Sequence, residues 1–330
     1  MSLFTFRRLC ASGLALISCA VALSLAPSAT HAESTFSGKP MRLIVPFPPG
    51  GGGDRLGRLL AGPLGKALGT DIVVENQGGA NGNIALQTVA RAEPDGRVLG
   101  LTLVDHIAVN PLIYKSLPYD PLKDFKPVGL VLSTPYIVAV AENGPATLAD
   151  FVGQAQAKPG DVSIGYPTTN IQIAMLDLEA RSTSSLNLIP YRGIAQGLPD
   201  MLGGRLSAWV GTSVTMRGYI EGGKVRGLAV TSAERVKVLP DIPTVAEAGY
   251  PGYQHVSWYG VIAPAGTPDR TINELNKALN DVLGRPEVKA EIERDGAAVM
   301  GGTPAALKSA LESDLRRLAP IVQSAGLKPQ

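Results

Sequence analysis

Glycine-rich turns that follow apolar runs are the residues of this chain best suited to bind a ligand. The run Leu43–Val45 is followed by three prolines within Pro46–Pro49 and then by four consecutive glycines at 50–53. Glycine leaves backbone N–H groups accessible, and the dipole of a following helix adds partial positive charge. A phosphate or a carboxylate suits such a site. A tight strand-to-helix turn with Asp54 as the helix N-cap explains the same residues without any ligand.

Two further loops extend this pattern. The strand-like residues 71–76 lead into a second glycine-rich loop at 77–83, and a strand over 98–104 leads to Asp105 and His106. Strands and helical leucine patterns therefore alternate through this part of the chain, which is typical of a parallel α/β sheet. Functional loops in such sheets lie at the carboxyl ends of the strands, so we expect these three loops to meet.

The rest of the chain predicts a second α/β unit followed by a helical end. Residues 128–140 read as a long strand with an interruption at Thr134-Pro135, and a helix over 148–157 follows. Short strands over 162–165, 187–190, 206–210 and 226–230 alternate with helical segments. The leucine stripes after Thr267-Pro268 and Thr303-Pro304 indicate helices whose apolar faces pack on the core.

Several enzyme classes lack their sequence signals. No G-x-G-x-x-G register fits 50–57, which argues against a dinucleotide site. The segment Gly211-Thr-Ser213 lacks the second glycine of a nucleophile elbow, and neither His106 nor His255 has a metal-ligand spacing. We therefore expect no catalytic residue, no metal and no cofactor. An exported hydrolase built from scattered Ser, Asp and His residues remains the enzyme alternative.

The first 32 residues have the layout of a cleaved signal peptide. Arg7 and Arg8 precede an apolar stretch, and small residues at Thr30 and Ala32 suit a cut before residue 33. Leu16–Cys19 also resembles a bacterial lipobox, so a lipoprotein anchored at Cys19 is the alternative, although the polar tether usual after such a cysteine is missing. We expect a soluble periplasmic protein.

The mature chain then contains no cysteine, because Cys10 and Cys19 both lie in the leader. It has no disulfide and no thiol nucleophile. Removing Arg7 and Arg8 from the 30 basic residues leaves 28 against 28 acidic ones. This balance favours neither nucleic acid nor an anionic membrane as partner.

A series of motifs spread over roughly 39–328 resembles the substrate-binding receptors of the tripartite tricarboxylate transporters, the Bug family. Single motifs are short, but they occur in the family's order: Pro46–Asp54, Glu75-Asn76-x-x-Gly-Ala80, Pro94–Gly96, Leu117–Asp120, Lys123–Pro127, Pro190–Gly193, Leu228–Ser232, Leu239–Gly249 and Ala263–Pro268.

The resemblance implies an α/β, two-lobed periplasmic-binding-protein fold of type II, each lobe a mixed, mainly parallel sheet flanked by helices. Lobe one is then 33–133 with 254–330, and lobe two is 134–253. Such a receptor, expected as a monomer, captures a small carboxylate between its lobes and delivers it to a membrane permease. A sensor subunit that presents its ligand to a signalling receptor is the alternative.

The loops and the resemblance together give the expected ligand-binding residues: Phe47, Pro49, Gly50, Gly51, Asp54, Asn76, Ala80, Asp105, His106, Thr168, Thr169, Asn170, Tyr191 and Ser213. Asn76 also suits a plain turn, and His106 a packed core position. Two departures alter the lobe-two side. In the segment 163–171, Pro167 replaces a family glycine and removes a backbone donor, and Ile171 replaces a family histidine. After Gly203-Gly204, Arg205-Leu-Ser207 stands where the family often has Gln-Val-Asp. Ligand identity therefore does not carry over from relatives.

Overall fold

The computed structural model describes Phe36 and residues 38–327. The expected signal peptide, 1–32, and the alternative lipidation site at Cys19 lie outside these residues. Phe36 begins the compact unit to which the described residues belong. None of the helices in this described part combines the length and apolar character needed to cross a membrane.

The first sheet contains the parallel strands that the sequence predicts. Strand β1 (Met41–Val45) lies between β2 (Ile72–Asn76) and β3 (Val98–Leu103) and is parallel to both. Strand β9 (Val256–Pro264) then runs antiparallel between β3 and β4 (Phe125–Ala141), and the short β10 (Ala298–Val299) pairs with β4. The carboxyl ends of β1 and β3 consequently lie at the same edge of the sheet.

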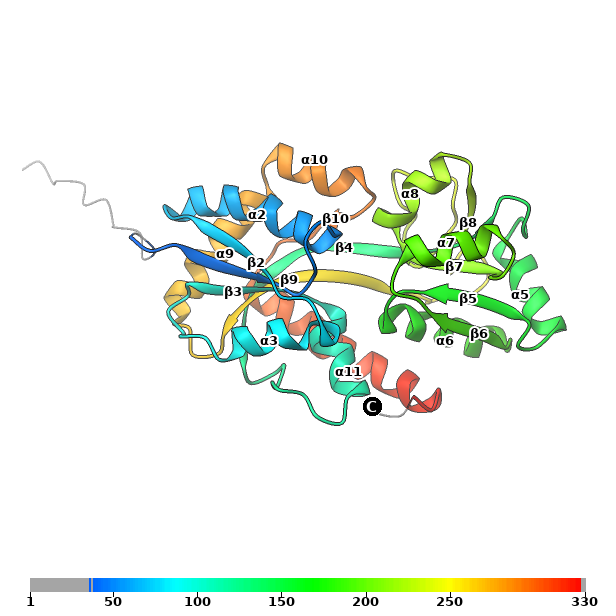
Figure 1. Cartoon of the computed structure of the whole chain (residues 1–330), viewed down its shortest axis with the longest axis horizontal. Helices are drawn as coiled ribbons and strands as arrows, with labels where there is room; N and C mark the ends of the chain where they lie inside the picture. Colours follow the sequence, from blue (N-terminus) through cyan, green and yellow to red (C-terminus); the bar gives the residue numbers. More distant parts are fainter. Residues whose placement is uncertain (1–35, 37, 328–330) are drawn as a thin grey trace, which may run out of the picture. The chain divides into compact units, whose positions relative to one another are not determined.

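A second sheet continues along β4, as Figure 1 shows. Here β4 pairs antiparallel with β7 (Ala208–Thr212) and β8 (Val225–Val230). Strand β5 (Val162–Tyr166) is parallel to both β7 and β6 (Leu186–Pro190). Two mixed sheets are thus joined through one strand.

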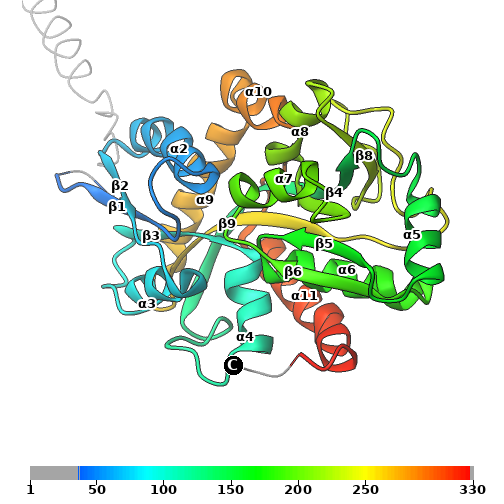
Figure 2. The same cartoon turned by 45° about the vertical axis from the view of Figure 1, so that its right-hand side comes forward.

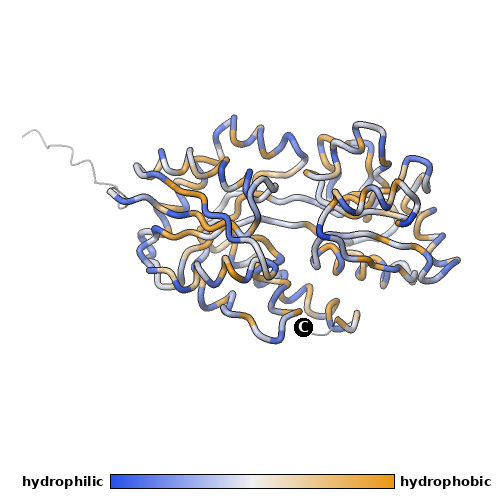
Figure 3. The backbone as a smooth tube through the Cα atoms, viewed as in Figure 1, coloured by the Kyte–Doolittle hydropathy of each residue, from blue (hydrophilic) through white to orange (hydrophobic). Residues whose placement is uncertain are grey.

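The expected interruption of β4 at Thr134-Pro135 is wrong, because the strand is continuous over its 17 residues. Pro135 is the last residue of β4 that pairs with β9, and Tyr136 is the first that pairs with β7. The break in the sequence pattern therefore marks an exchange of partners. This stretch also has intermediate hydropathy, pale in Figure 3. The lobe boundaries at 133/134 and 253/254 stay a prediction.

Helices cover both sheets. Those associated with the first sheet are α2 (Gly52–Leu68), α3 (Asn83–Ala90), α4 (Asn110–Ile113), α9 (Asp269–Leu283), α10 (Pro286–Arg294) and α11 (Pro304–Ser324). Those associated with the second are α5 (Leu148–Ala157), α6 (Thr169–Ser182), α7 (Ile194–Leu202) and α8 (Ser213–Glu221). Leu275 and Leu279 of α9 and Leu307 and Leu311 of α11 are buried against the first sheet, as their spacing predicts.

Helix α11 also reaches the second half of the fold, beside α6 (Figure 2). Its last turns bury Leu318 and Val322 against Ile173 of α6.

A chain of polar contacts reinforces this packing. His255 Nε2 lies 2.8 Å from Asp177 Oδ2 of α6, and its Nδ1 lies 3.0 Å from Arg317 of α11. Arg317 donates to Asp314, whose other carboxylate oxygen accepts from Trp258 Nε1 at 2.7 Å. Helices α6 and α11 are thereby tied through β9.

Candidate ligand-binding site

A cavity of about 270 Å³ lies where the ends of several strands meet. It receives residues from the junctions after β1, β3, β5 and β7, from the central strands β4 and β9, and from α10 with the turn after it. Its walls are mainly apolar and aromatic, and they include Phe47, Leu56, Leu59, Leu103, Leu132, Tyr136, Pro167, Ile171, Val214, Tyr259, Ile292 and Ala297. The carboxyl ends of parallel strands thus form a binding site, as α/β folds commonly do.

The first turns of three helices lie at this cavity: Gly52 and Gly53 of α2, the N-cap Thr168 of α6, and Thr212 to Thr215 at the start of α8. Gly51, the N-cap of α2, has no side chain, and neither Thr168 nor Thr212 accepts a backbone N–H of its own helix as a cap. The first N–H groups of a helix have no partner within it, and the dipole makes this end positive. The helix N-termini therefore supply partial positive charge at the cavity.

Side-chain hydrogen bonds of Asp54 and Asn76 fix the backbone of the proline- and glycine-rich loop after β1. Asp54 Oδ2 accepts the N–H of Gly50 at 2.9 Å, and Oδ1 pairs with Arg58 at 3.0 Å. The Gly50 N–H, with help from Arg58, lowers the pKa of Asp54 to about 2. Asn76 donates to the carbonyl oxygen of Phe47 at 3.1 Å. Asp54 and Asn76 thus fix the loop that places the Phe47 ring in the cavity wall.

Asp54 is not the N-cap of α2, which the local pattern allowed. Gly51 occupies that position with an extended backbone (φ −80°, ψ 172°), and Asp54 is the third residue of the helix, in its first turn. A carboxylate there complements the helix dipole and leaves the N-terminal N–H groups of Gly52 and Gly53 uncapped.

Asp105 follows β3 at the start of a π-helical turn, Asp105–Val109, and lines the cavity. Its side chain is buried, and Oδ1 accepts the backbone N–H of Asn170 at 3.1 Å. Burial raises the pKa of Asp105 to about 6, although the bonds from Asn170 and Thr168 oppose this rise. Asp105 therefore occupies the N-terminus of α6 with a carboxylate of the protein itself.

His106 lies behind the cavity wall. Its ring centroid is 5.6 Å from that of Phe47, and its Nδ1 accepts the N–H of Leu103 at 3.4 Å. Burial lowers its pKa to about 3, so the imidazole is neutral at physiological pH. A Cβ at Gly82 would come within 2.5 Å of this ring. His106 thus packs between Gly82 and Phe47.

Asn170 and Ser213 also lie just behind the wall. Asn170 Nδ2 donates to the hydroxyl of the wall residue Tyr136 at 2.5 Å, while its buried Oδ1 has no hydrogen-bond partner within the described residues. Ser213 Oγ donates to the carbonyl oxygen of Gly296 at 3.0 Å and lies 3.0 Å from the hydroxyl of Thr134. Both residues position groups that line the cavity.

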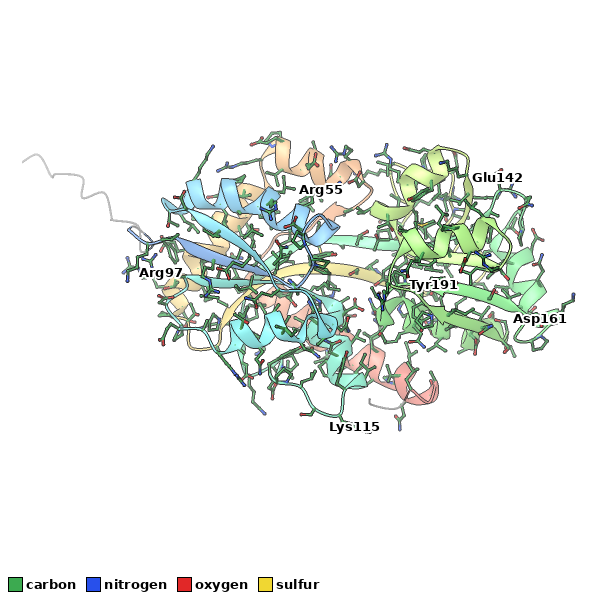
Figure 4. The ribbon with its side chains drawn as sticks, viewed as in Figure 1. Arg55, Arg97, Lys115, Glu142, Asp161 and Tyr191 are labelled. Atoms are coloured by element: carbon green, nitrogen blue, oxygen red, sulfur yellow. The ribbon has the colours of Figure 1, made fainter. Side chains whose placement is uncertain are left out.

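The structure therefore brings Phe47, Asp105 and Thr168 to the cavity and places Asp54, Asn76, His106, Asn170 and Ser213 in support. The other expected ligand-binding residues lie outside its lining, and their contact with a ligand stays a prediction: Pro49, Gly50, Gly51, Ala80, Thr169 and Tyr191. The Tyr191 hydroxyl donates to Asp200 at 2.7 Å (Figure 4 labels Tyr191).

Sequence reasoning missed the wall formed by α10 and the central strand β4. Arg55 of α2 pairs with Asp295 at the end of α10 (Arg55 is labelled in Figure 4), and Glu291 and Ile292 of α10 also line the cavity. Both views place α10 between α2 and α8. No motif marks these residues, because α10 follows β1 by more than two hundred positions. Within Phe36 and 38–327, no group of three His, Cys, Asp or Glu side chains is placed to hold a metal.

A preformed, apolar cavity at the ends of two joined α/β sheets is typical of a small-molecule binding site. The family model described as the tripartite tricarboxylate transporter family receptor matches residues 56–327, and the chain belongs to that family. Its members are periplasmic solute-binding receptors.

Individual relatives agree over most of their length. Protein BugT of Bordetella pertussis is 32% identical over 305 residues, 91% of this chain and 94% of its own. The structure of R. palustris Rpa4515 with adipate is 31% identical, with a TM-score of 0.81 over 89% of this chain and 100% of that one. MatC of Rhodopseudomonas palustris with bound malate is 29% identical, with a TM-score of 0.75 over 87% and 100% of the two chains. These similarities confirm the resemblance that the motifs indicate.

Proposed function

We propose that this protein captures a small carboxylate in the cavity and delivers it to the membrane permease of a tripartite tricarboxylate transporter. The observation that carries the proposal is the meeting of three helix N-termini at one cavity. Helix N-termini are ready-made anion sites, because unpartnered N–H groups and the dipole act together. The adipate and malate held by Rpa4515 and MatC support a carboxylate as the anion.

The expected lobes fit this proposal. The lining combines Phe47 and Asp105 from lobe one (33–133 and 254–330) with Thr168 and Val214 from lobe two (134–253). A ligand in the cavity would therefore contact both lobes. With cleavage of the leader after residue 32, the protein would act in the periplasm, where the family's receptors work, as a monomer that meets the permease subunits.

A matched pair of variants tests the anion site. Gly52 is the first residue of α2, where proline is well tolerated, and the extended backbone of Gly51 suits a residue before proline. Gly52→Pro removes an N–H donor at the cavity while keeping the helix. A charge-assisted hydrogen bond is worth roughly 1.5–3 kcal/mol, so we expect carboxylate affinity to fall by about 10- to 100-fold.

Gly52→Ala is the control, because it keeps the N–H and its Cβ would meet nothing within 4 Å. We expect its affinity to change by less than about threefold. Isothermal titration of the mature chain against a panel of carboxylates and their neutral amides measures both variants. Equal binding of acids and amides to the wild type, or equal losses in the two variants, would contradict the proposal.

A further inference from the structure

The cavity offers little to a ligand with several charges. Among the described residues that line it, Arg55 is the one basic side chain, and Arg55 already pairs with Asp295. Glu291, also at the wall, pairs with Arg294 of its own helix. Most of the remaining surface is made of leucine, valine, isoleucine and aromatic side chains. A ligand must therefore bring a largely apolar body.

Asp105 adds a buried negative charge to the lining of this cavity. Its side chain is only 3% exposed, and the donors that the structure gives it are uncharged: the Asn170 N–H, its own N–H and the Thr168 hydroxyl. The neighbouring His106 is neutral, and Tyr136 and Tyr259 on the adjoining strands hold their protons because burial raises the pKa of each phenol. At pH 7.5 the Asp105 carboxylate is therefore ionised, and no basic side chain of the described residues pairs with it.

Asp105 also uses one of the three helix N-termini. Because its carboxylate accepts from the first turn of α6, the uncapped turns of α2 and α8 are left for a ligand. Those two turns suit one carboxylate group. A second carboxylate on the ligand would share this cavity with Asp105, and like charges in a partly desolvated site repel strongly.

We propose that this site selects carboxylates that carry one negative charge on an apolar aliphatic or aromatic body, and that Asp105 excludes a second carboxylate. This inference rests on the proposed function and assigns the ligand class of the same cavity. It separates this chain from Rpa4515, whose structure holds the dicarboxylate adipate.

Pairs of acids that differ by one carboxylate test the inference. Hexanoate and adipate have the same number of carbons, as do 4-methylbenzoate and terephthalate; hexanamide and 4-methylbenzamide are the neutral references. Titration calorimetry of the wild type at pH 7.5 should give a monoacid affinity roughly 100-fold above that of the matching diacid. Asp105→Asn should narrow this ratio at least tenfold by raising the affinity for the diacid.

Asp161→Asn is the matched control, because Asp161 is an exposed aspartate in a turn away from the cavity lining (Figure 4). Its monoacid-to-diacid ratio should stay within twofold of wild type. If the wild type binds the diacid as tightly as the monoacid, or more tightly, the inference is wrong, but the proposed function as a carboxylate receptor is still supported. No binding by either monoacid would also overturn the inference, whereas amide binding as tight as acid binding would overturn both the inference and the proposed function. The wild-type comparison decides even where Asp105→Asn folds poorly.

Discussion

Gly53→Ala tests whether the Phe47 ring packs directly against Gly53 in the first turn of α2, as it does in the structure. A Cβ on Gly53 would lie 2.1 Å from Phe47 Cδ2 and 2.6–2.7 Å from two further ring atoms. Since ordinary carbon contacts begin near 3.5 Å, the ring must move by roughly 1.5 Å. It is also held on its far sides by His106 and Tyr259, whose ring centroids lie 5.6 and 6.2 Å away.

Two opposing terms set the size of the effect. Forcing an extra methyl group into a packed site costs about 1–3 kcal/mol, whereas replacing glycine by alanine in a helix gains about 0.5–1 kcal/mol. The net loss is therefore at most about 2.5 kcal/mol. An unfolding entropy of about 2.1 cal/mol/K per residue turns this into a fall in melting temperature of up to roughly 4 °C. The displaced ring would also enter the cavity, and we expect carboxylate affinity to fall at least about tenfold.

Gly62→Ala is the matched control, because Gly62 lies in the same helix and its Cβ would meet nothing within 4 Å. It should raise the melting temperature slightly and leave binding unchanged. Differential scanning calorimetry and ligand titration of both variants give the comparison. If the melting temperature of Gly53→Ala equals or exceeds that of Gly62→Ala, and its carboxylate affinity equals that of the wild type, Phe47 is not held against α2 as the structure implies.

Three further predictions concern buried side chains elsewhere in the structure. Burial raises the pKa of Asp105 from 3.8 to about 6, so its contribution to the free energy of unfolding falls by roughly 3 kcal/mol as the pH rises through that range. Urea titrations should therefore show the stability of Asp105→Asn, relative to wild type, increasing between pH 4 and pH 7. Asp314→Asn weakens the bonds from its indole and guanidinium partners and should lower urea stability by about 1–3 kcal/mol; an unchanged midpoint would contradict the role of that chain of contacts. At Gly197 a Cβ would lie 1.9 Å from the Trp209 ring, so Gly197→Ala should lower the melting temperature and shift tryptophan fluorescence, whereas Gly218→Ala, which meets nothing within 4 Å, should do neither.

The sequence predicts the elements of this fold because local signals determine them. The apolar run before the prolines is β1, and the leucine stripes of α9 and α11 face the core. The exchange of partners in β4 was not predictable in the same way. A proline after a threonine reads as a strand break, and only the position of β9 shows why the strand continues.

Some residues of the candidate site are likewise predictable from local sequence signals, and others are not. Phe47, Asp105 and Thr168 follow strands, so the rule that strand ends carry function finds them. The same rule gives Asn76 and Asp54, whose side chains turn back into the protein to hold the loop. Tyr136, Tyr259 and the residues of α10 reach the cavity through tertiary packing, which no local pattern records.

The position of β9 has a consequence for how the chain folds. Strand β3 pairs with β1 on one side and with β9 on the other, although β9 is made more than 150 residues later. Until residues 256–264 arrive, the edge of β3 at Gly100–Leu103 has no partner, and an unpaired edge is a site of aggregation. Folding from the N-terminus onward therefore cannot complete the first sheet, and such long-range pairing slows folding. A chain truncated before β9 should remain soluble only while another strand, or a chaperone, covers that edge.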